Sequence, residues 1–227
     1  MVILESLKRF FASSIGKKII VAVTGLGFVL FLIGHLAGNL LMYVGPDAMN
    51  TYATTLHDKA PLLWVARIGL IVALVLHVAF TVLLKKQNLA ARRSRYAYSA
   101  VVQTSLSTRI MIWSGLTILV FLIYHLLHFT FQVGNDYSTY RDATGRPDVY
   151  RMVIEGFRWI PATLFYLLGM TLLCSHLGHG VASIFQTLGL ATDKNWPLIK
   201  SSSHAFAILI YVGFISIPIS VLFGIIP

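Results

Sequence analysis

The chain has 227 residues, of which 57% are apolar and 11% are charged. A soluble domain with this balance would lack the polar surface needed to cover itself, so the composition excludes an ordinary soluble protein and indicates a membrane protein. The net charge is +10, but the basic residues form short clusters between long apolar runs instead of one polar face. We therefore interpret the charge as a topology signal and expect no nucleic-acid binding.

The first 18 residues carry apolar side chains at helical spacing, with Lys8 and Arg9 between them. This pattern predicts an amphipathic helix on the cytoplasmic membrane surface, which we assign to residues 1–18. The apolar run that follows is too long for the core of a signal peptide and lacks a small-x-small cleavage site, so we expect it to remain as a spanning helix.

Five apolar stretches reach or approach the roughly 20 residues that a helix needs to cross the hydrocarbon core. They predict an all-α integral membrane protein with a single membrane domain, 19–227. The five predicted transmembrane helices cover about 19–44, 62–84, 110–132, 160–185 and 204–226. The segment 133–159 is the only loop on its side expected to hold much structure outside the membrane.

Lysine and arginine gather in alternate segments between the predicted helices, and these segments all lie on one side of the membrane. Such residues favour the cytoplasmic side. One group precedes the first helix, another lies between the second and third, and a third lies between the fourth and fifth. The members are Lys8, Arg9, Lys17, Lys18, Lys85, Lys86, Arg92, Arg93, Arg95, Arg109, Lys194 and Lys200. The pattern places the N-terminus in the cytoplasm and the C-terminus outside.

The single cysteine, Cys174, lies inside an apolar run. One cysteine cannot form an internal disulfide, and it cannot supply the several thiolates of a zinc or iron–sulfur site. Any sulfur-ligated cluster that works with this chain is therefore expected to belong to a partner protein.

Four histidines occupy the first four predicted helices, and an ionisable residue inside a membrane helix suggests a function. Neighbouring helices run in opposite directions, so position along a helix converts to depth at about 1.5 Å per residue. His35 and His125 fall in the outer half of the membrane, and His77 and His176 fall in the inner half. Two pairs of histidines result, at depths separated by a distance on the order of 10 Å.

A low-spin haem b needs two imidazoles on opposite sides of a flat macrocycle, and facing helices of a bundle can supply them. The four histidines therefore predict a di-haem bundle formed by the first four helices. Histidines hydrogen-bonded across helix contacts are the alternative. Nearby glycines favour haem, because they let a macrocycle approach the backbone, although their spacing also suits plain helix packing. These glycines are Gly34, Gly38, Gly178 and Gly180.

Two further histidines compete as ligands, because each follows one of the four by three residues and lies on nearly the same helix face. His128 competes with His125, and His179 competes with His176; the spacing alone does not choose between them. His204 opens the fifth helix at the cytoplasmic interface, where it is an ordinary interfacial residue or a partner for a propionate or a quinone.

Arg67 is a charged residue about two turns into the second predicted helix from its outer end. A long basic side chain at this depth can snorkel to the interface. It can equally pair with a propionate of the outer haem, since its depth is near that of His35.

Motifs around the histidines carry a resemblance that extends over essentially the whole chain. They are SSIGKK at 13–18, TGLGFVLFLIGHLAGNL around His35, LHVAF around His77, IYHLLHF around His125 and SHLGHGVASIFQTLGL around His176. Together they resemble the di-haem, five-helix cytochrome b subunit of succinate dehydrogenase and fumarate reductase. In this family the ligand of the first helix pairs with that of the third, and the second pairs with the fourth.

The resemblance implies that His35 and His125 bind the iron of the outer haem b, and that His77 and His176 bind the iron of the inner haem b. It also implies that His128 and His179 are neighbours of the ligands and not ligands themselves. An acidic residue associated with quinone chemistry or proton transfer in some family members has no clear counterpart, since Cys174 and Ser175 precede the helix-four ligand.

The implied function is that of the membrane-anchoring, quinone-reactive subunit of a succinate:quinone oxidoreductase in the bacterial cytoplasmic (inner) membrane. Such a subunit passes electrons between an iron–sulfur subunit and membrane quinone, while a flavoprotein subunit acts on succinate and fumarate. This chain would carry no dicarboxylate site and no catalytic residue. Its basic cytoplasmic loops and N-terminal helix would dock the partners, although anionic lipid attracts the same charges.

Two other functions fit parts of the pattern. One is the cytochrome b subunit of another quinone-linked dehydrogenase, against which the helix number and the HLAGNL and FQTLGL runs argue. The other is a haem-free transporter or anchor in which the histidines relay protons. The presence of b-type absorption bands distinguishes the second hypothesis from haem binding.

Overall fold

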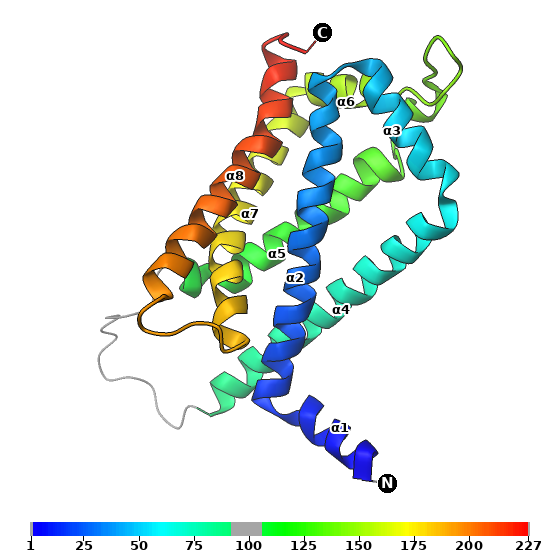
Figure 1. Ribbon diagram of the computed structural model, residues 1–227. Coiled ribbons are helices and arrows are strands. Elements are labelled where there is room, and N and C mark those ends of the chain that lie inside the picture. Colours follow the sequence, from blue (N-terminus) through cyan, green and yellow to red (C-terminus); the bar gives the residue numbers. More distant parts are fainter. Residues whose placement is uncertain (1, 92–105, 227) are drawn as a thin grey trace.

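The computed structural model describes residues 2–91 and 106–226, with side chains from 3 to 91 and from 111 to 226. These residues form eight α-helices with short 3-10 and π-helical segments and no β-strand; the one bridge joins Arg141 to Pro147. The prediction of an all-α protein is confirmed for this part of the chain (Figure 1). The helices are α1 (Val2–Ala12), α2 (Ser14–Asn39), α3 (Pro46–Asp58), α4 (Ala60–Ala90), α5 (Leu106–His125), α6 (Val149–Arg158), α7 (Ile160–Thr187) and α8 (Trp196–Leu222).

Within the described residues five helices are long and apolar enough to cross a membrane, as predicted, and they indicate a multi-pass membrane protein. The spans are Ser14–Tyr43, Ala60–Ala90, Met111–Thr130, Ile160–Thr187 and Trp196–Leu222. The first includes the 3-10 turn η1 (Leu40–Tyr43), and the third includes the π-helical turn η2 (Leu126–Thr130). The fifth begins at Trp196 instead of residue 204, because a proline in the first turn suits the start of a helix.

The short helix α1 joins α2 at Ser13, whose Oγ accepts a hydrogen bond of 2.9 Å from the backbone N–H of Gly16. This cap starts α2 at Ser14, so the last residues of the segment 1–18 lie in the first turns of the spanning helix. In α1 the apolar side chains of Ile3, Leu4 and Leu7 are exposed. An exposed apolar face on a short basic helix suits a membrane surface.

One end of the bundle carries a folded cap, which consists of α3, the segment 131–148 and α6 (Figure 1). The expectation that 133–159 was the only structured loop on this side is wrong, because the connection between the first two spans forms α3. Met49, Asn50 and Ala53 recur at helical spacing on its buried face. The sequence alone does not reveal this polar helix, because its buried stripe is short and is covered only where α6 packs against it.

Polar contacts hold the cap together. The Asn50 side chain is only 1% exposed; its Nδ2 donates to Asp148 Oδ1 (3.0 Å) and its Oδ1 accepts from the Tyr150 N–H (3.0 Å). Arg146 donates to Asp47 of α3 (2.7 Å) and to Asp142 of the same loop (2.8 Å). The loop is therefore tied to both helices of the cap.

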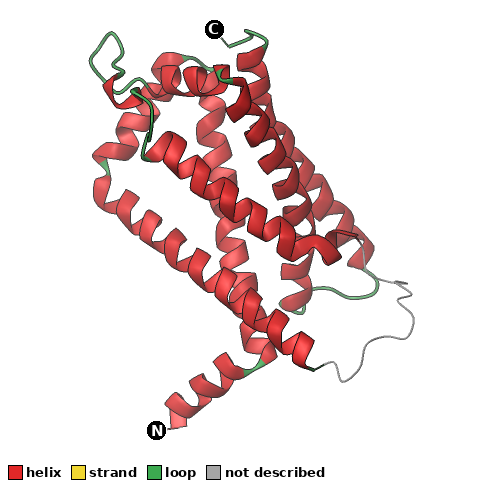
Figure 2. Cartoon of the chain, turned by 180° about the vertical axis from the view of Figure 1, so that it is seen from behind, coloured by secondary structure: helices red, strands yellow, loops and turns green. Residues whose placement is uncertain are grey.

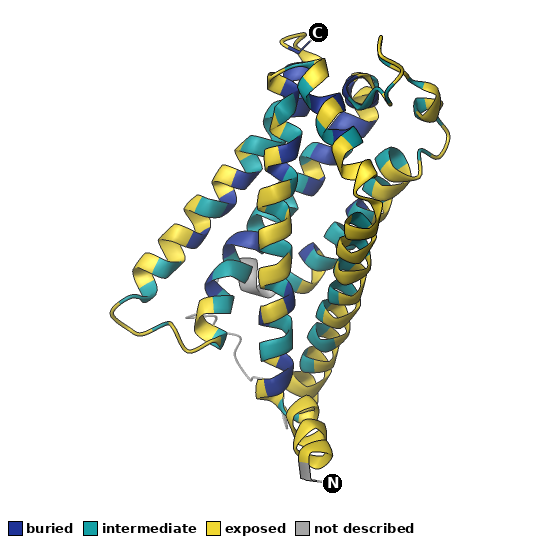
Figure 3. Cartoon of the chain, turned by 45° about the vertical axis from the view of Figure 1, so that its right-hand side comes forward, coloured by how far each residue is buried: buried dark blue, intermediate teal, exposed yellow. Residues whose placement is uncertain are grey.

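The largest buried cluster of the described residues lies where the bundle meets the cap. Helix α2 packs against α4, α7 and α8, while α5 packs against α7, and the loops lie at the two ends (Figures 1 and 2). The buried cluster includes Phe121, Tyr150 and Tyr166 and joins the cap to the bundle. No residue of α4 is buried, and Figure 3 shows this helix as exposed or half-buried along its length. Such exposure suits a helix that faces lipid.

The chain termini lie at opposite ends of the bundle, with α1 at the end away from the cap (Figure 1). The basic clusters of α1, the start of α2 and the end of α4 share that end, as the alternation of charges predicts. Arg92, Arg93 and Arg95 lie outside the described residues, and for Arg109 only the helical backbone is described.

Candidate functional site

The structure brings the histidines of the spanning helices together at two levels. In the level near the cap, called the outer level, the rings of His35 (α2) and His125 (α5) have centroids 5.8 Å apart and are nearly perpendicular. In the other level, called the inner level, His77 (α4) lies close enough to His176 (α7) for an electrostatic interaction. These are the two pairs expected from depth.

The helices α2 and α5 each contribute one histidine to the outer level and one hydroxyl residue to the inner level. Thr24 contacts His77 and Ser114 contacts His176 at the inner level. Each hydroxyl residue precedes the outer histidine of its own helix, His35 or His125, by roughly three helical turns, or about 16 Å along the axis. This spacing puts the hydroxyl and the histidine on the same face of each helix. The separation of the levels has the expected order of magnitude.

Hydrogen bonds at the inner level fix which ring nitrogen carries the proton. Thr24 Oγ1 donates to the Ile20 carbonyl (2.7 Å), so it can only accept from His77 Nδ1–H at 3.0 Å. Ser114 Oγ likewise donates to the Met111 carbonyl (3.0 Å) and accepts from His176 Nδ1–H at 3.2 Å. The Nε2 atom of each neutral imidazole then keeps its lone pair. A histidine that binds a metal normally donates its other N–H in this way.

Glycines of the neighbouring helices lie against the inner rings. A Cβ atom at Gly25 would lie 3.5 Å from His77 Cε1, and one at Gly115 would lie 3.5 Å from His176 Cε1. A methyl group is thus at ordinary contact distance, while a larger side chain would displace the ring.

Of the four glycines predicted to make room for a macrocycle, two face open space. These are Gly34 and Gly180, where an added Cβ meets nothing within 4 Å. A Cβ at Gly38 would collide with Tyr52 at 2.6 Å, and one at Gly178 would lie 3.5 Å from α8. The last two therefore serve helix packing, and for them the macrocycle interpretation is wrong.

The outer pair is surrounded by aromatic rings. His35 contacts Phe31 (5.2 Å between centroids) and Phe214 (5.9 Å), and no described residue makes a hydrogen bond to its ring nitrogens. His125 Nδ1 lies 3.1 Å from the hydroxyl of Tyr166. An imidazole in an apolar setting is costly unless a polar partner binds it, so His35 suits a residue that binds a metal.

The rival histidines occupy different surroundings from the pairs. His128 lies in the π-helical turn η2, whose wider winding moves it around the helix relative to His125. Its ring nitrogens lie 3.3 Å from Tyr166 Oη and 3.4 Å from Tyr137 Oη. His179, on α7, lies within electrostatic range of His204, whereas the Ser114 hydroxyl and His77 lie near His176.

The two remaining candidates lie about two turns into their helices, His204 in α8 and Arg67 in α4. His204 is exposed, and its Nδ1 lies 2.7 Å from the Lys200 carbonyl. The guanidinium of Arg67 lies over the ring of Trp64, 5.2 Å from its centroid. Stacking on an aromatic ring of its own helix gives this cation a partner other than a propionate, which favours the snorkelling interpretation of Arg67.

Sequence reasoning treated Lys17 only as a topology signal and missed Thr24, Ser114 and Tyr166. Lys17 is 6% exposed and donates from Nζ to the Ala12 carbonyl at 2.6 Å. It lies on the same face of α2 as Thr24, two turns closer to the N-terminus. A buried cation there can receive an anionic group that extends from the inner level. Hydroxyl–glycine pairs such as Thr24–Gly25 and Ser114–Gly115 were the available signal.

The separation of the two outer rings suits a haem group between them. Metal–imidazole bonds of about 2 Å on opposite sides of one iron put ring centroids roughly 6 Å apart, close to the 5.8 Å between His35 and His125. Among the described residues no extensive packing joins α2 to α5 or α4 to α7, although these helices carry the paired rings. The same residues contain no group of three or more ligands for a bare metal ion. A macrocycle supplies the ligands that two histidines lack.

Comparison with protein-family models, with curated proteins and with solved structures finds no match for the chain.

Proposed function

We propose that the chain is the membrane-anchoring cytochrome b subunit of a succinate:quinone oxidoreductase in a bacterial cytoplasmic membrane. It holds two haem b groups, one between His35 and His125 and one between His77 and His176. The observation that carries the haem proposal is that the paired histidines come from helices that show no extensive packing against each other among the described residues. The motifs around the histidines support the assignment to this kind of complex.

Bound haem supplies one-electron redox chemistry. The protein orients the ligands: Thr24 and Ser114 each accept an Nδ1–H and so present Nε2 toward the iron. The exposed apolar faces of the spanning helices keep the complex in lipid, and Lys17 offers a cation for a propionate of the inner haem.

The partners dock at the end that carries α1. This end holds the described basic clusters, and an iron–sulfur subunit seated there lies nearest to His77 and His176. The inner haem therefore exchanges electrons with the cluster, and the outer haem exchanges electrons with the inner one. Membrane quinone is the substrate that exchanges electrons with these haem groups.

A haem-free helix bundle is the second candidate, because the Thr24–His77 hydrogen bond also joins α2 to α4 without a cofactor. The two candidates differ in their visible absorption and in whether succinate can reduce them through partner subunits. A haem-free anchor gives no b-type bands, whereas the proposed subunit gives bands that succinate reduces when the partners are bound.

The experiment is co-expression with candidate flavoprotein and iron–sulfur subunits, followed by purification through a tag on this chain. We expect all three proteins to co-purify, and we expect succinate to reduce the haem and then added quinone. Charge reversal at Lys85 and Lys86, at the end of α4, should weaken co-purification. The matched control reverses Lys59 and Arg158 at the cap and should leave it unchanged. Binding that depends on the cap instead would overturn the docking assignment.

A further inference from the structure

A chain of hydrogen-bonding side chains leads from the outer histidine pair into the cap. Tyr166 Oη lies 3.1 Å from His125 Nδ1 and 3.3 Å from His128 Nδ1. Tyr137 Oη in turn lies 3.4 Å from His128 Nε2. One residue of α7 thus connects two histidines of the third span, and the second histidine connects to the cap.

Tyr166 has one hydroxyl proton, and each neutral imidazole has one N–H. Tyr166 can accept a hydrogen bond from each imidazole or donate its own proton to one of them. Its apolar surroundings offer no other acceptor among the described residues, so its proton bonds to one of the two rings, and this leaves two directions for the series of hydrogen bonds. If His125 donates Nδ1–H to Tyr166, then Tyr166 donates to His128 Nδ1, and His128 donates Nε2–H to Tyr137. In the reverse direction His125 would carry its proton on Nε2 and could not bind iron through that atom. Iron binding by His125 therefore selects the first direction along the whole chain.

The surroundings of Tyr166 leave its hydroxyl few other partners. The residue is 6% exposed and lies among the rings of Phe121 (5.1 Å), Phe157 (5.0 Å) and Phe129 (5.7 Å). In an apolar setting a hydrogen bond is stronger than in water, and an unpaired hydroxyl is costly. The position of Tyr166 between two ring nitrogens is thus strongly specified.

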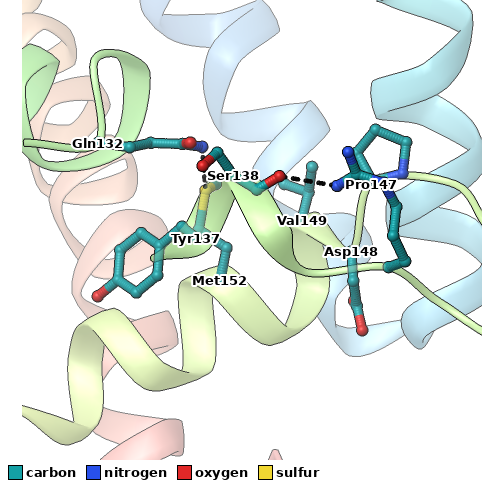
Figure 4. A pocket seen from close by; sticks show the side chains of 8 residues that line it. Gln132, Tyr137, Ser138, Pro147, Asp148, Val149 and Met152 are labelled. Atoms are coloured by element: carbon teal, nitrogen blue, oxygen red, sulfur yellow. Dashed lines mark hydrogen bonds between the residues drawn. The ribbon is translucent and has the colours of Figure 1, made fainter. Parts of the chain in front are cut away.

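The far end of the chain reaches a pocket in the cap. Tyr137 lines a pocket of about 200 Å³ together with Gln132, Pro147, Asp148 and other residues of the same segment. Figure 4 shows Tyr137 on one side of this pocket and Pro147 and Asp148 on the other. Asn135 supports this end, since its Nδ2 donates to the His128 carbonyl and its Oδ1 accepts from the Tyr137 N–H.

We infer that Tyr166 is a positioning residue for the outer haem: it accepts Nδ1–H of His125 and, through His128 and Tyr137, links that ligand to the cap. This inference rests on the proposed haem function. A partner that accepts the ligand's second N–H raises its basicity and fixes the ring orientation. A more basic ligand stabilises ferric iron, so this series of hydrogen bonds lowers the reduction potential of the outer haem.

The test uses the full chain with its haem, purified with His77→Ala so that only the outer haem remains. Tyr166→Phe is compared in this background with the matched control Tyr124→Phe, which lies beside it but whose hydroxyl makes no hydrogen bond with a described residue. The readouts are a redox titration followed by visible absorption and the affinity for haem. We expect Tyr166→Phe to raise the potential and to weaken haem binding about 10–100-fold, and we expect Tyr124→Phe to change neither.

His128→Gln should shift the potential in the same direction by a smaller amount, because Tyr166 remains as the acceptor. Equal potentials in the parent and in Tyr166→Phe would overturn the inference, as would an equal shift from Tyr124→Phe. With His77 intact, loss of both haems from Tyr166→Phe would also contradict it, since the effect is confined to the outer level. Absence of haem from the unmodified chain would instead refute the proposed function, so the two failures are distinguishable.

Discussion

The inner and outer histidine levels orient their imidazole rings through different contacts. At the inner level each ring bonds to a hydroxyl whose own proton goes to a carbonyl in the preceding turn of the same helix. At the outer level one ring has aromatic contacts only, and the other bonds to Tyr166, which also bonds to His128. The inner level is thus oriented locally by two helices, whereas the outer level depends on the cap.

This difference predicts that changes in the cap affect the outer level and spare the inner one. Changes at the hydroxyl–glycine pairs should do the reverse. The two levels lie about 16 Å apart along α2, so their responses should be nearly independent. Variants that change one level and spare the other test this difference.

Replacing His77 with Ala should remove the inner haem and leave the outer one, because no described hydrogen bond connects the two levels. Haem per chain should fall from two to one, measured by absorption of the extracted haem against protein. His57→Ala is the control, since His57 is exposed on α3 and its Nδ1 faces the Ala53 carbonyl. Retention of two haems in His77→Ala would contradict the assignment of this ligand.

Gly25→Val should displace the His77 ring, since even the first carbon of the side chain reaches ordinary contact with Cε1 at 3.5 Å. We expect loss of most inner haem, and we expect Gly25→Ala to retain it because a single methyl group fits. Haem content of the two variants, purified in parallel, gives the comparison. Normal inner haem in the valine variant would show that the ring does not lie where the structure has it.

Thr24→Val keeps the shape of the side chain but removes the acceptor for His77 Nδ1–H. The inner haem should bind about 10–100-fold more weakly, while the outer haem keeps its affinity. Thr24→Ser retains the hydroxyl and should restore near-normal binding. Haem transfer to apomyoglobin measures both affinities, and equal loss from the two levels would refute the independence of the inner site.

The acid stability of the cap depends on Asp142, whose side chain is 13% exposed. Partial desolvation acts to raise the pKa of this carboxyl, but hydrogen bonds from Thr144 and Arg146 outweigh it and hold the pKa below its usual value. A lowered folded pKa gives stability that is complete above the unfolded value of 3.8 and is lost as pH falls through the folded value.

Asp142→Asn should therefore open the cap to proteolysis near residues 140–148 at neutral pH, and the difference from the parent should shrink in strong acid. Limited proteolysis across a pH series, with an acid-tolerant protease, measures it. The outer haem should be perturbed in this variant while the inner haem is unchanged. A difference that grows as the pH falls would contradict the lowered pKa.

The smallest effect is expected from Arg67→Leu, because the guanidinium stacks on Trp64 of the same helix. The potential of the outer haem and quinone turnover should stay close to those of the parent. A large change in the outer potential would restore the interpretation of Arg67 as the partner of a propionate.

Much of the fold follows from long apolar runs, which is why the five spans were predictable. The start of α8 was misplaced because Trp196 and Pro197 read as loop residues until they are recognised as the first turn of a helix. Helix α3 was missed because its buried stripe consists of Met49, Asn50 and Ala53, and the polar Asn50 is buried only by its bonds to the segment before α6 and to α6 itself.

The pairing of the histidines was predictable because depth follows from helix direction and residue number. The residues that orient them were not, since Thr24, Ser114 and Tyr166 come from other helices and are ordinary in their own sequence context. The π-helical turn at His128 was also hidden, because nothing in the sequence signals the extra residue in that turn.

The most direct test of the central claim is a reduced-minus-oxidised visible spectrum of the purified chain, combined with a count of haem per polypeptide. We expect b-type bands from two haems per chain, titrating as two one-electron components. A colourless protein, or one haem that survives replacement of either histidine pair, would contradict it.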